Sequence, residues 1–310
     1  MADDPLVSII TPTHNRARVL PRAIASVLAQ THENLELIVV DDCSTDRTPE
    51  LISSMQDPRL RYVRLPENVG AAAARNAGLE IMRGDFACFL DDDDEILPDK
   101  LRLQLERFAG SSPDVGLVYC GASLCLDAEK RKVIEVQPVL RGAVYAQLLG
   151  RNYFVMSSPL IRREDLEAAG GFDAMLSSCI DWDLWIRIAR RCEFDYVPDL
   201  LCIHYIHGDQ ISTSLEKKIA ARELIMHKYG EDLSRYPASF ADSLRRLAIL
   251  YCLAGDPGRG RTCFRKALST GSGKNSLYAH LLLAALAPSL HRRMLERRFT
   301  LEVGEERFLI

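Results

Sequence analysis

The first 126 residues alternate short apolar runs, rich in β-branched side chains, with segments of helical period. The apolar runs predict strands at 7–11, 37–40, 62–65, 86–90 and 116–126. Among the segments between them, 19–28 has the spacing of an amphipathic helix and 71–82 is rich in alanine. Such alternation is typical of βαβ units, in which helices cover a parallel sheet. We therefore predict an α/β fold with a mostly parallel, Rossmann-like sheet flanked by helices.

The pattern changes further along the chain. Helices are expected from 98 to 108 and from Asp181 to Cys192, followed by two short strands at 194–197 and 201–205. After residue 215 every predicted element is a helix, and the ranges are 216–229, 238–254, 260–269 and 277–299. Sustained helical periodicity without strand patterns indicates a separate helical region. The predicted organisation is a domain over 1–215 and a C-terminal helical region over 216–310.

Composition narrows the class of protein. The chain has 310 residues, of which 47% are hydrophobic and 26% charged, as in soluble globular proteins. A net charge of -4 argues against a nucleic-acid partner, because such proteins usually carry a basic domain. The nine cysteines form no CxxC pair, and the N-terminus lacks the pattern of a secretory signal. The apolar stretch 281–290 contains Pro288 and is too short to span a bilayer. We expect a cytoplasmic protein.

Carboxylates follow two of the predicted strands. Asp41 and Asp42 end the second strand, and the run 91–94 follows the fourth. Ligands of open α/β sheets bind beyond the carboxyl ends of the strands, so these acids are expected to line one cleft. Adjacent carboxylates repel one another unless a cation lies among them, and oxygen ligands suit Mg²⁺ or Mn²⁺. The alternative is a solvated acidic loop that caps the next helix.

Four motifs in this order resemble the family 2 glycosyltransferases. They are Val7 to Arg16, Ile38 to Asp46, Gly70 to Gly78 with Arg75-Asn76, and Phe89 to Asp94. The resemblance covers about residues 6 to 215 and implies a GT-A fold. In that fold 6–110 is the nucleotide-binding half and 111–215 the acceptor half of the catalytic domain. It also implies a divalent cation and inversion at the anomeric carbon.

The resemblance assigns roles at the nucleotide end of the cleft. Pro12 and His14 correspond to a turn that lies along the nucleobase, and Asp42, with Asp41 beside it, corresponds to an acid that hydrogen-bonds the base. For these two acids the alternative is turn formation with helix capping. Arg75 orients the acids or the diphosphate, or it forms a structural ion pair.

The run Asp91-Asp92-Asp93 matches the DxD motif of the family. By resemblance, Asp92 faces the ribose, with Asp91 beside it, and Asp93 holds the metal. Asp94 is a candidate for contacting the sugar or supporting the metal ligands.

Asp181 corresponds to the catalytic base of the family. The sequence departs from the family pattern in having Ile180 where an acid often precedes that base. The alternative is that Asp181 is only a helix N-cap. His207 lies in a segment where relatives often place a histidine on the diphosphate or metal, with His204 three residues before it. The alternative for both is a structural histidine.

The resemblance implies an inverting glycosyltransferase that uses Mn²⁺ or Mg²⁺. The implied donor is a nucleotide-sugar, with a UDP-sugar favoured, and the acceptor is a saccharide or a lipid-linked molecule. Cell-surface polysaccharide or glycolipid biosynthesis is the expected context. Two alternatives stay open, a nucleotidyltransferase and a non-catalytic nucleotide-sugar binding or scaffold protein.

The last predicted helix combines leucines with a basic second half, Arg292, Arg293, Arg297 and Arg298. This pattern favours peripheral contact with the inner face of a membrane, and core packing is the alternative. The sequence carries no sign of the oligomeric state.

Overall fold

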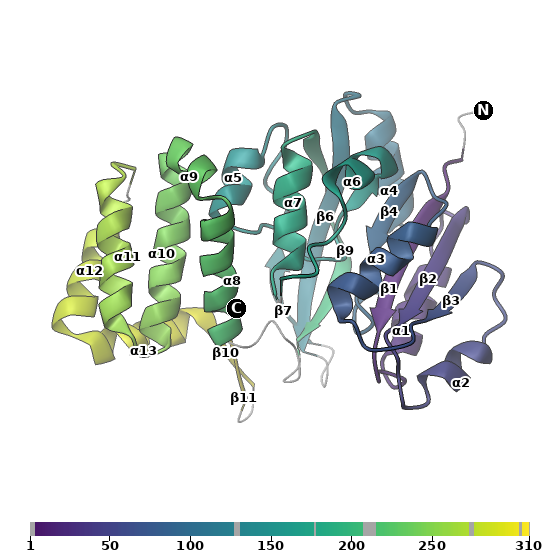
Figure 1. Ribbon diagram of the computed structural model, residues 1–310, viewed down its shortest axis with the longest axis horizontal. Coiled ribbons are helices and arrows are strands. Elements are labelled where there is room, and N and C mark those ends of the chain that lie inside the picture. The colour runs from purple at the N-terminus through teal and green to yellow at the C-terminus, as the bar shows by residue number, and fades with distance from the viewer. Residues whose placement is uncertain are drawn as a thin grey trace. The chain divides into compact units, whose positions relative to one another are not determined.

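The computed structural model describes residues 4–126, 131–176, 178–206, 215–272, 276–303 and 306–309 (Figure 1). By their internal contacts the residues form two compact units. The first comprises Met1–Val144, Tyr153–Met175 and Leu184–Ile206, and the second comprises Tyr145–Asn152, Leu176–Asp183 and His207–Ile310. Two short segments before residue 215 therefore group with the helical region. The predicted boundary at 215 stays a prediction.

The first unit is built on a nine-stranded sheet in the order β3-β2-β1-β4-β8-β6-β9-β5, with β7 paired to β6. Strands β1, β2, β3 and β4 pair in parallel, and β6 and β9 are also parallel, whereas β8 runs antiparallel to both β4 and β6. The strands are β1 Val7–Thr13, β2 Leu35–Asp41, β3 Leu60–Arg64, β4 Phe86–Phe89, β5 Glu95–Ile96, β6 Val115–Leu126, β7 Arg131–Val136, β8 Leu160–Arg162 and β9 Glu193–Ile206. The predicted mostly parallel sheet is confirmed.

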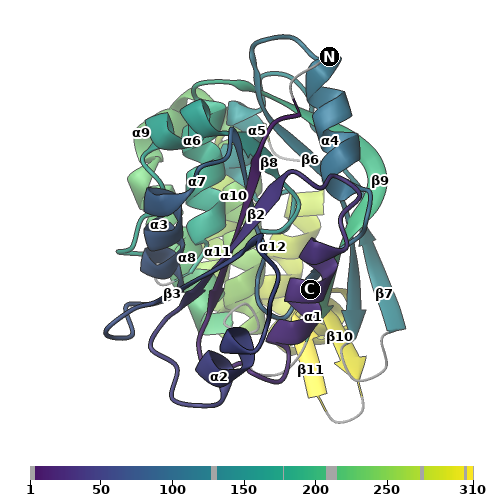
Figure 2. The same cartoon turned by 90° about the vertical axis from the view of Figure 1, so that its right-hand side faces the viewer.

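Helices cover both faces of this sheet. Figure 2 shows α3 and α6 on one face and α1 and α4 on the other. The helices of the first unit are α1 Leu20–Leu28, α2 Thr48–Ser53, α3 Ala71–Ile81, α4 Lys100–Ala109 and α6 Arg163–Ala169. Helix α7 Ile180–Ala189 has its first residues in the second unit and the rest in the first. The buried core is rich in the β-branched residues that favour strands, such as Val7, Ile9 and Val39.

Helix α3 lies unusually close to the sheet because of Gly78. A Cβ at this position would lie 2.5 Å from Cγ2 of Ile10 and 3.3 Å from Cγ2 of Val40. The first distance is far below a normal carbon–carbon contact, so a side chain would push α3 away from β1. Glycine at 78 therefore allows α3 to pack closely against β1 and β2.

Strand β9 differs from its prediction. Two short strands were expected, but residues 193–206 form one strand that pairs with β6 along its length and, near its end, with β5. Its pairing register with β6 shifts at Cys120/Gly121 and Gly121/Ala122, so a bulge allows the strand to continue past Pro198. Pro198 and Asp199 separate the two apolar runs in the sequence, and the bulge accommodates them within one strand.

The second unit is mainly helical. Its elements are α5 Tyr145–Gly150, α8 Leu215–Lys228, α9 Gly230–Arg235, α10 Pro237–Leu253, α11 Pro257–Ser269, α12 Ser276–Leu286, α13 Pro288–Phe299, β10 Thr300–Val303 and β11 Glu306–Leu309. Leu244, Ala248 and Phe264 are at the centre of its core. The single helix predicted at 277–299 is wrong, because Pro288 lacks the N–H that a continuous helix needs and instead begins α13. Within the described residues, we find none of these helices to be both long and apolar enough to cross a bilayer.

Candidate active site

Three carboxylates converge just beyond the end of β4. The chain leaves β4 after Phe89, and the Leu90 N–H donates to the Ile10 carbonyl at 3.1 Å, which holds the next residues beside β1. One oxygen each from Asp91, Asp93 and Asp94 lies within 4.8 Å of the others. The sequence predicted acids in one cleft, and the structure brings these three together.

Asp92 is turned away from that group. Its Oδ2 accepts a hydrogen bond of 2.7 Å from the Thr13 hydroxyl at the end of β1, and the residue is 9% exposed. Burial raises the pKa of Asp92 to about 7, and the neighbouring charge of Asp93 contributes, while the Thr13 bond opposes the rise. Asp92 therefore binds β1 rather than sharing an ion with the other three acids. Its predicted contact with the ribose stays a prediction.

The carboxylate of Asp94 forms an ion pair and a hydrogen bond with residues of β9. Its Oδ2 lies 2.9 Å from Nδ1 of His204, and its Oδ1 accepts the Tyr205 N–H at 3.1 Å. Burial alone would lower the pKa of His204, but the Asp94 carboxylate raises it to about 9. A protonated imidazole thus compensates one carboxylate of the cluster. His204 was considered in the sequence only as the neighbour of His207, and its spacing to Asp94 along the chain carried no signal of this pair.

Arginines from α1, α3 and the turn after β1 balance the remaining charge. Arg75, buried on α3, forms an ion pair with Asp91. Arg16 Nη1 lies 3.5 Å from Asp93 Oδ2, and Arg22 donates to the Asp93 carbonyl oxygen. Of the two roles predicted for Arg75, the structure supplies the ion pair, which also orients Asp91 within the group.

Asp41 and Asp42 hold the loops around the end of β2. Both are buried, and Asp41 accepts the Tyr62 hydroxyl at 2.6 Å and the Ser44 N–H at 2.8 Å. The two oxygens of Asp42 accept the N–H groups of Val69 and Gly70 at 2.7 and 2.8 Å. The turn-forming role considered for these acids is therefore present. Their predicted hydrogen bond to the nucleobase stays a prediction.

The turn after β1 is tied to the same region. Pro12 lies within β1 opposite Val40, and His14 Nδ1 lies 2.7 Å from the Asp42 carbonyl oxygen. Asn15, at a φ of 55°, accepts the N–H groups of Thr45 and Asp46 through its side-chain oxygen. Asn15 does not cap α1, which begins at Leu20, and its side chain bridges two loops. The positive φ that asparagine tolerates was the available sequence signal.

Asp181 lies in the second unit, on the first turn of α7. Its Oδ2 accepts a hydrogen bond of 2.7 Å from Nδ2 of Asn152. The neighbouring Trp182 is buried and donates its indole N–H to the Leu148 carbonyl at 2.6 Å. Asn152 and Trp182 thus fix the start of α7, and Asn152 was not singled out in the sequence. The role of Asp181 as a base stays a prediction, and His207 lies outside the described residues.

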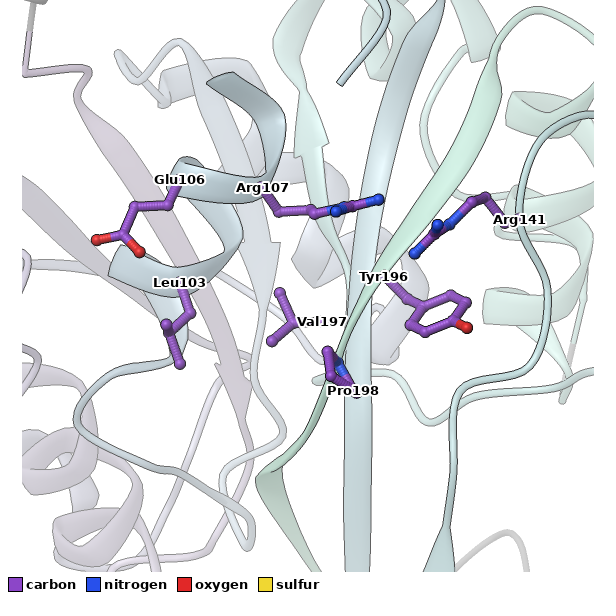
Figure 3. A pocket seen from close by; sticks show the side chains of 7 residues that line it. All are labelled: Leu103, Glu106, Arg107, Arg141, Tyr196, Val197 and Pro198. Carbon is purple, nitrogen blue, oxygen red and sulfur yellow. The ribbon is translucent and has the colours of Figure 1, made fainter. Parts of the chain in front are cut away.

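A cavity of about 530 Å³ elsewhere in the first unit contains none of the predicted site residues. Figure 3 shows its lining, in which the guanidinium groups of Arg107 and Arg141 point toward each other and Arg141 lies over the ring of Tyr196, 4.7 Å from its centre. Both arginines are engaged by the buried Asp195, with Nε to carboxylate distances of 2.7 and 2.6 Å. These bonds account for the arginines, so the cavity offers no reacting group comparable to the acids after β4.

The group of Asp91, Asp93 and Asp94 fits a divalent cation. All three offer hard oxygen ligands, and Asp93 and Asp94 are buried. Mg²⁺ and Mn²⁺ prefer such ligands and are commonly shared between carboxylates and substrate phosphates. Asp93 was the predicted ligand, and the structure adds Asp91 and Asp94 as residues able to share the ion.

Comparison with known proteins identifies the chain. Residues 8–157 match the sequence profile described as Glycosyl transferase family 2. Succinoglycan biosynthesis protein ExoO of Rhizobium meliloti (strain 1021) is 32% identical over 245 residues, covering 74% of this chain and 70% of ExoO.

Two solved structures share the fold. S. aureus TarS 1-349 in complex with UDP-GlcNAc has a TM-score of 0.68 at 17% identity, covering 98% of this chain and 96% of TarS. Mannosyltransferase PcManGT from Pyrobaculum calidifontis, in complex with GDP-Man and Mn²⁺, has a TM-score of 0.62 at 20% identity, covering 94% of this chain and 84% of PcManGT.

The mostly parallel sheet has the GT-A fold, and the acid cluster lies just beyond the carboxyl end of its strand β4. The chain belongs to glycosyltransferase family 2. Sugar transfer is therefore supported over the two alternatives, nucleotidyl transfer and non-catalytic binding.

Proposed function

We propose that this glycosyltransferase moves a sugar from a UDP-sugar to a hydroxyl group of a saccharide or lipid-linked acceptor, with inversion, during polysaccharide assembly. The grouping of Asp91, Asp93 and Asp94 carries the proposal, since three converging carboxylates suit a cation that binds a diphosphate. The UDP-GlcNAc complex of TarS favours uridine, and the succinoglycan relative favours a polysaccharide product.

In the proposed reaction, Asp91, Asp93 and Asp94 hold Mn²⁺ or Mg²⁺, which would supply positive charge to the departing diphosphate. Arg75 and His204 keep Asp91 and Asp94 in position through the ion pairs described above. The nucleobase and ribose lie along Pro12, His14, Asp42 and Asp92.

Asp181 accepts the proton of the acceptor hydroxyl. A carboxylate is a weak base toward a free alcohol, but the proton becomes acidic as the oxygen bonds to the anomeric carbon. Asn152 donates to one oxygen of Asp181 and so orients the carboxylate on the first turn of α7. One displacement opposite the diphosphate inverts the anomeric centre.

The donor is tested by thermal shift with UDP, GDP, ADP, CDP and dTDP, each with Mn²⁺ or with EDTA. A ligand that binds only the folded protein stabilises it by about 2.7 kcal/mol at one hundred times its Kd. We expect UDP to raise the Tm in Mn²⁺ and to have little effect in EDTA. If only another nucleotide raises the Tm, the donor carries that nucleotide in place of UDP. If no nucleotide raises the Tm, the proposal of a nucleotide-sugar donor is wrong.

The base is tested with Asp181→Asn, which keeps the shape and the contact region of Asn152 but cannot accept the proton. We expect kcat to fall by about a thousandfold with an unchanged KM for the donor. Glu231→Gln, at an exposed position on α9, is the matched control and retains full activity. Full transfer by Asp181→Asn would show that the base is another residue.

We also propose peripheral contact with the inner face of an anionic membrane through α12 and α13. Leu282, Leu286, Leu290 and Met294 are 57%, 78%, 47% and 50% exposed, at a spacing of four residues. Arg293 and Arg297 are also exposed, and they lie three and seven residues after Leu290, about one and two helical turns along α13. Exposed apolar and basic side chains on one helix are typical of contact with an anionic membrane.

Flotation with vesicles containing phosphatidylglycerol tests this contact. We expect binding to be lost in Leu286→Glu and to weaken with salt. Absence of binding by the unmodified protein removes the membrane proposal while leaving sugar transfer intact.

A further inference from the structure

Arginines gather in the second unit beside the segment that carries Asp181. Arg222 comes from α8, and Arg245 and Arg246 come from α10. Arg222 Nη1 donates to the Gly150 carbonyl at 3.1 Å and lies 3.5 Å from the Ser243 hydroxyl. Ser243 lies two and three residues before Arg245 and Arg246 on α10, and the charges of both arginines act on Arg222.

The packing of α5 against α10 fixes this arrangement. A Cβ at Gly150 would lie 3.3 Å from the Ser239 carbonyl oxygen and 3.7 Å from Cβ of Asp242. Glycine therefore lets the end of α5 approach the backbone of α10 closely, which places the Gly150 carbonyl where Arg222 can reach it. The guanidinium position is a consequence of helix packing and not of a flexible surface side chain.

The charges in this cluster do not balance. Arg245 and Arg246 share the carboxylate of Asp242, with shortest distances of 2.6 and 3.0 Å. In the part of the chain that the structure describes, Arg222 contacts a carbonyl, a hydroxyl and the ring of Trp182, and the nearby carboxylate that acts on it, Asp242, is already shared by Arg245 and Arg246. Each guanidinium has five N–H donors, so donors remain on all three for a further acceptor.

The pKa values show the same excess of positive charge. Burial lowers the pKa of Arg222 to about 10, with the charges of Arg246 and Arg245 contributing and those of Cys179 and Asp242 opposing. Burial also lowers the pKa of Arg246 and outweighs the opposing effect of Asp242, with the charges of Arg151 and Arg245 contributing. A half-buried group of cations with one shared carboxylate is stabilised by an anion.

The position of the cluster indicates which anion it receives. The Arg222 guanidinium carbon lies 4.7 Å from the centre of the Trp182 ring, and Trp182 directly follows Asp181. In the proposed function Asp181 meets the acceptor, so a group bound near Trp182 belongs to the acceptor rather than to the nucleotide. Arginine forks bind phosphate through paired hydrogen bonds and charge.

We propose that Arg222, Arg245 and Arg246 form an anion site that binds a phosphate group of the acceptor and holds its hydroxyl near Asp181. This inference rests on the proposed function and names the acceptor class, which is a phosphate-bearing molecule. The phosphate is either a lipid-linked diphosphate or a phosphodiester within a polymer.

The test is calorimetric titration of the full chain with inorganic diphosphate in EDTA, which removes the divalent cation so that the acids after β4 do not contribute to binding. Binding is expected in the unmodified protein, and Arg222→Gln and Arg246→Gln should each weaken it about tenfold. Arg292→Gln is the matched control, because Arg292 is an exposed arginine paired with Glu296 on α13, and its affinity should change less than twofold.

Folding is checked by circular dichroism and Tm. Should Arg222→Gln fail to fold, Arg246→Gln carries the test, since its side chain is 29% exposed and its loss leaves Asp242 paired with Arg245. No binding by the unmodified protein, or equal affinity in all variants, overturns the anion site.

A second titration with dimethyl phosphate separates the two sources. Stronger binding of inorganic diphosphate indicates a lipid-linked diphosphate, and comparable binding of both indicates a phosphodiester polymer. Failure of the anion site with a normal UDP shift in Mn²⁺ leaves the proposed sugar transfer standing. Loss of the UDP shift itself is a failure of the proposed function instead.

Discussion

The two units of this glycosyltransferase differ in the sign of the charged groups that gather in them and in the groups that stabilise those charges. The first unit gathers carboxylates at strand ends, where each is held by N–H groups, hydroxyls or a cation, as Asp42 is by Val69 and Gly70. The second gathers guanidinium groups between helices, where Arg222 is held by a carbonyl and an aromatic ring.

The difference follows from the backbone of each unit. Strand ends and the loops after them present free N–H groups, which stabilise anions. Inside a helix the N–H groups bond to carbonyls of the same helix, so a charge buried between the middle parts of helices depends on side chains and on carbonyls at helix ends. An acidic site is therefore suited to the sheet unit and an anion-binding site to the helical unit.

The sharpest test of the acidic half of this comparison is Asp93→Asn. The amide keeps the size of the side chain but removes a negative ligand from the group of three acids, so kcat/KM should fall about a thousandfold or more. Transfer is measured over a range of Mn²⁺ concentrations, with Glu80→Gln, exposed on α3, as the control. Wild-type activity at low Mn²⁺ would contradict the assignment of this ligand.

A smaller effect is expected from Gly78→Ala, which tests whether the acids depend on close packing of α3. The added methyl group would meet Ile10 at 2.5 Å, and overpacking of a core commonly costs about 1 to 3 kcal/mol. Gly110→Ala is the control, because a Cβ there lies no closer than 3.7 Å to its neighbours. Denaturant titration should show a lower free energy of unfolding for Gly78→Ala only, and equal loss in both variants would oppose the packing argument.

The smallest effect concerns a buried acid away from the site, Glu36. Burial raises its pKa, but hydrogen bonds from Ser8, Arg83 and Arg61 outweigh it and hold the pKa below the ordinary 4.5. Because the pKa of Glu36 is lower in the folded state, its charge stabilises the protein at pH values above the unfolded pKa of 4.5. This stabilisation is lost as the pH falls through the pKa of the folded state.

Glu36→Gln should therefore lower the free energy of unfolding by about 1 kcal/mol at pH 7, and the difference should shrink below pH 4.5. Denaturation at pH 7 and pH 3.5 measures both values. If the difference in the free energy of unfolding between Glu36→Gln and the unmodified protein stays constant with pH, the charge of Glu36 does not contribute to stability. The stabilisation of buried carboxylates would then not be general in the first unit.

The sequence predicted the sheet, the helical region and the position of the acids, because these depend on local periodicity and on where strands end. It did not predict that β9 is one strand, since the bulge at Cys120/Gly121 depends on pairing between distant segments. The same applies within the site. Asp94 with His204, and Asp181 with Asn152, are pairs separated by 110 and 29 residues, and no local pattern relates their members.

The carboxylate of Asp42 connects the end of β2 to the loop that precedes α3, through both of its oxygens. Replacing Asp42 to change the nucleotide preference would release that loop. Weaker nucleotide binding by such a variant would then reflect a changed loop conformation as well as a lost contact with the base. Engineering of the donor should keep this residue and begin at His14, whose half-buried ring can be exchanged with less disturbance.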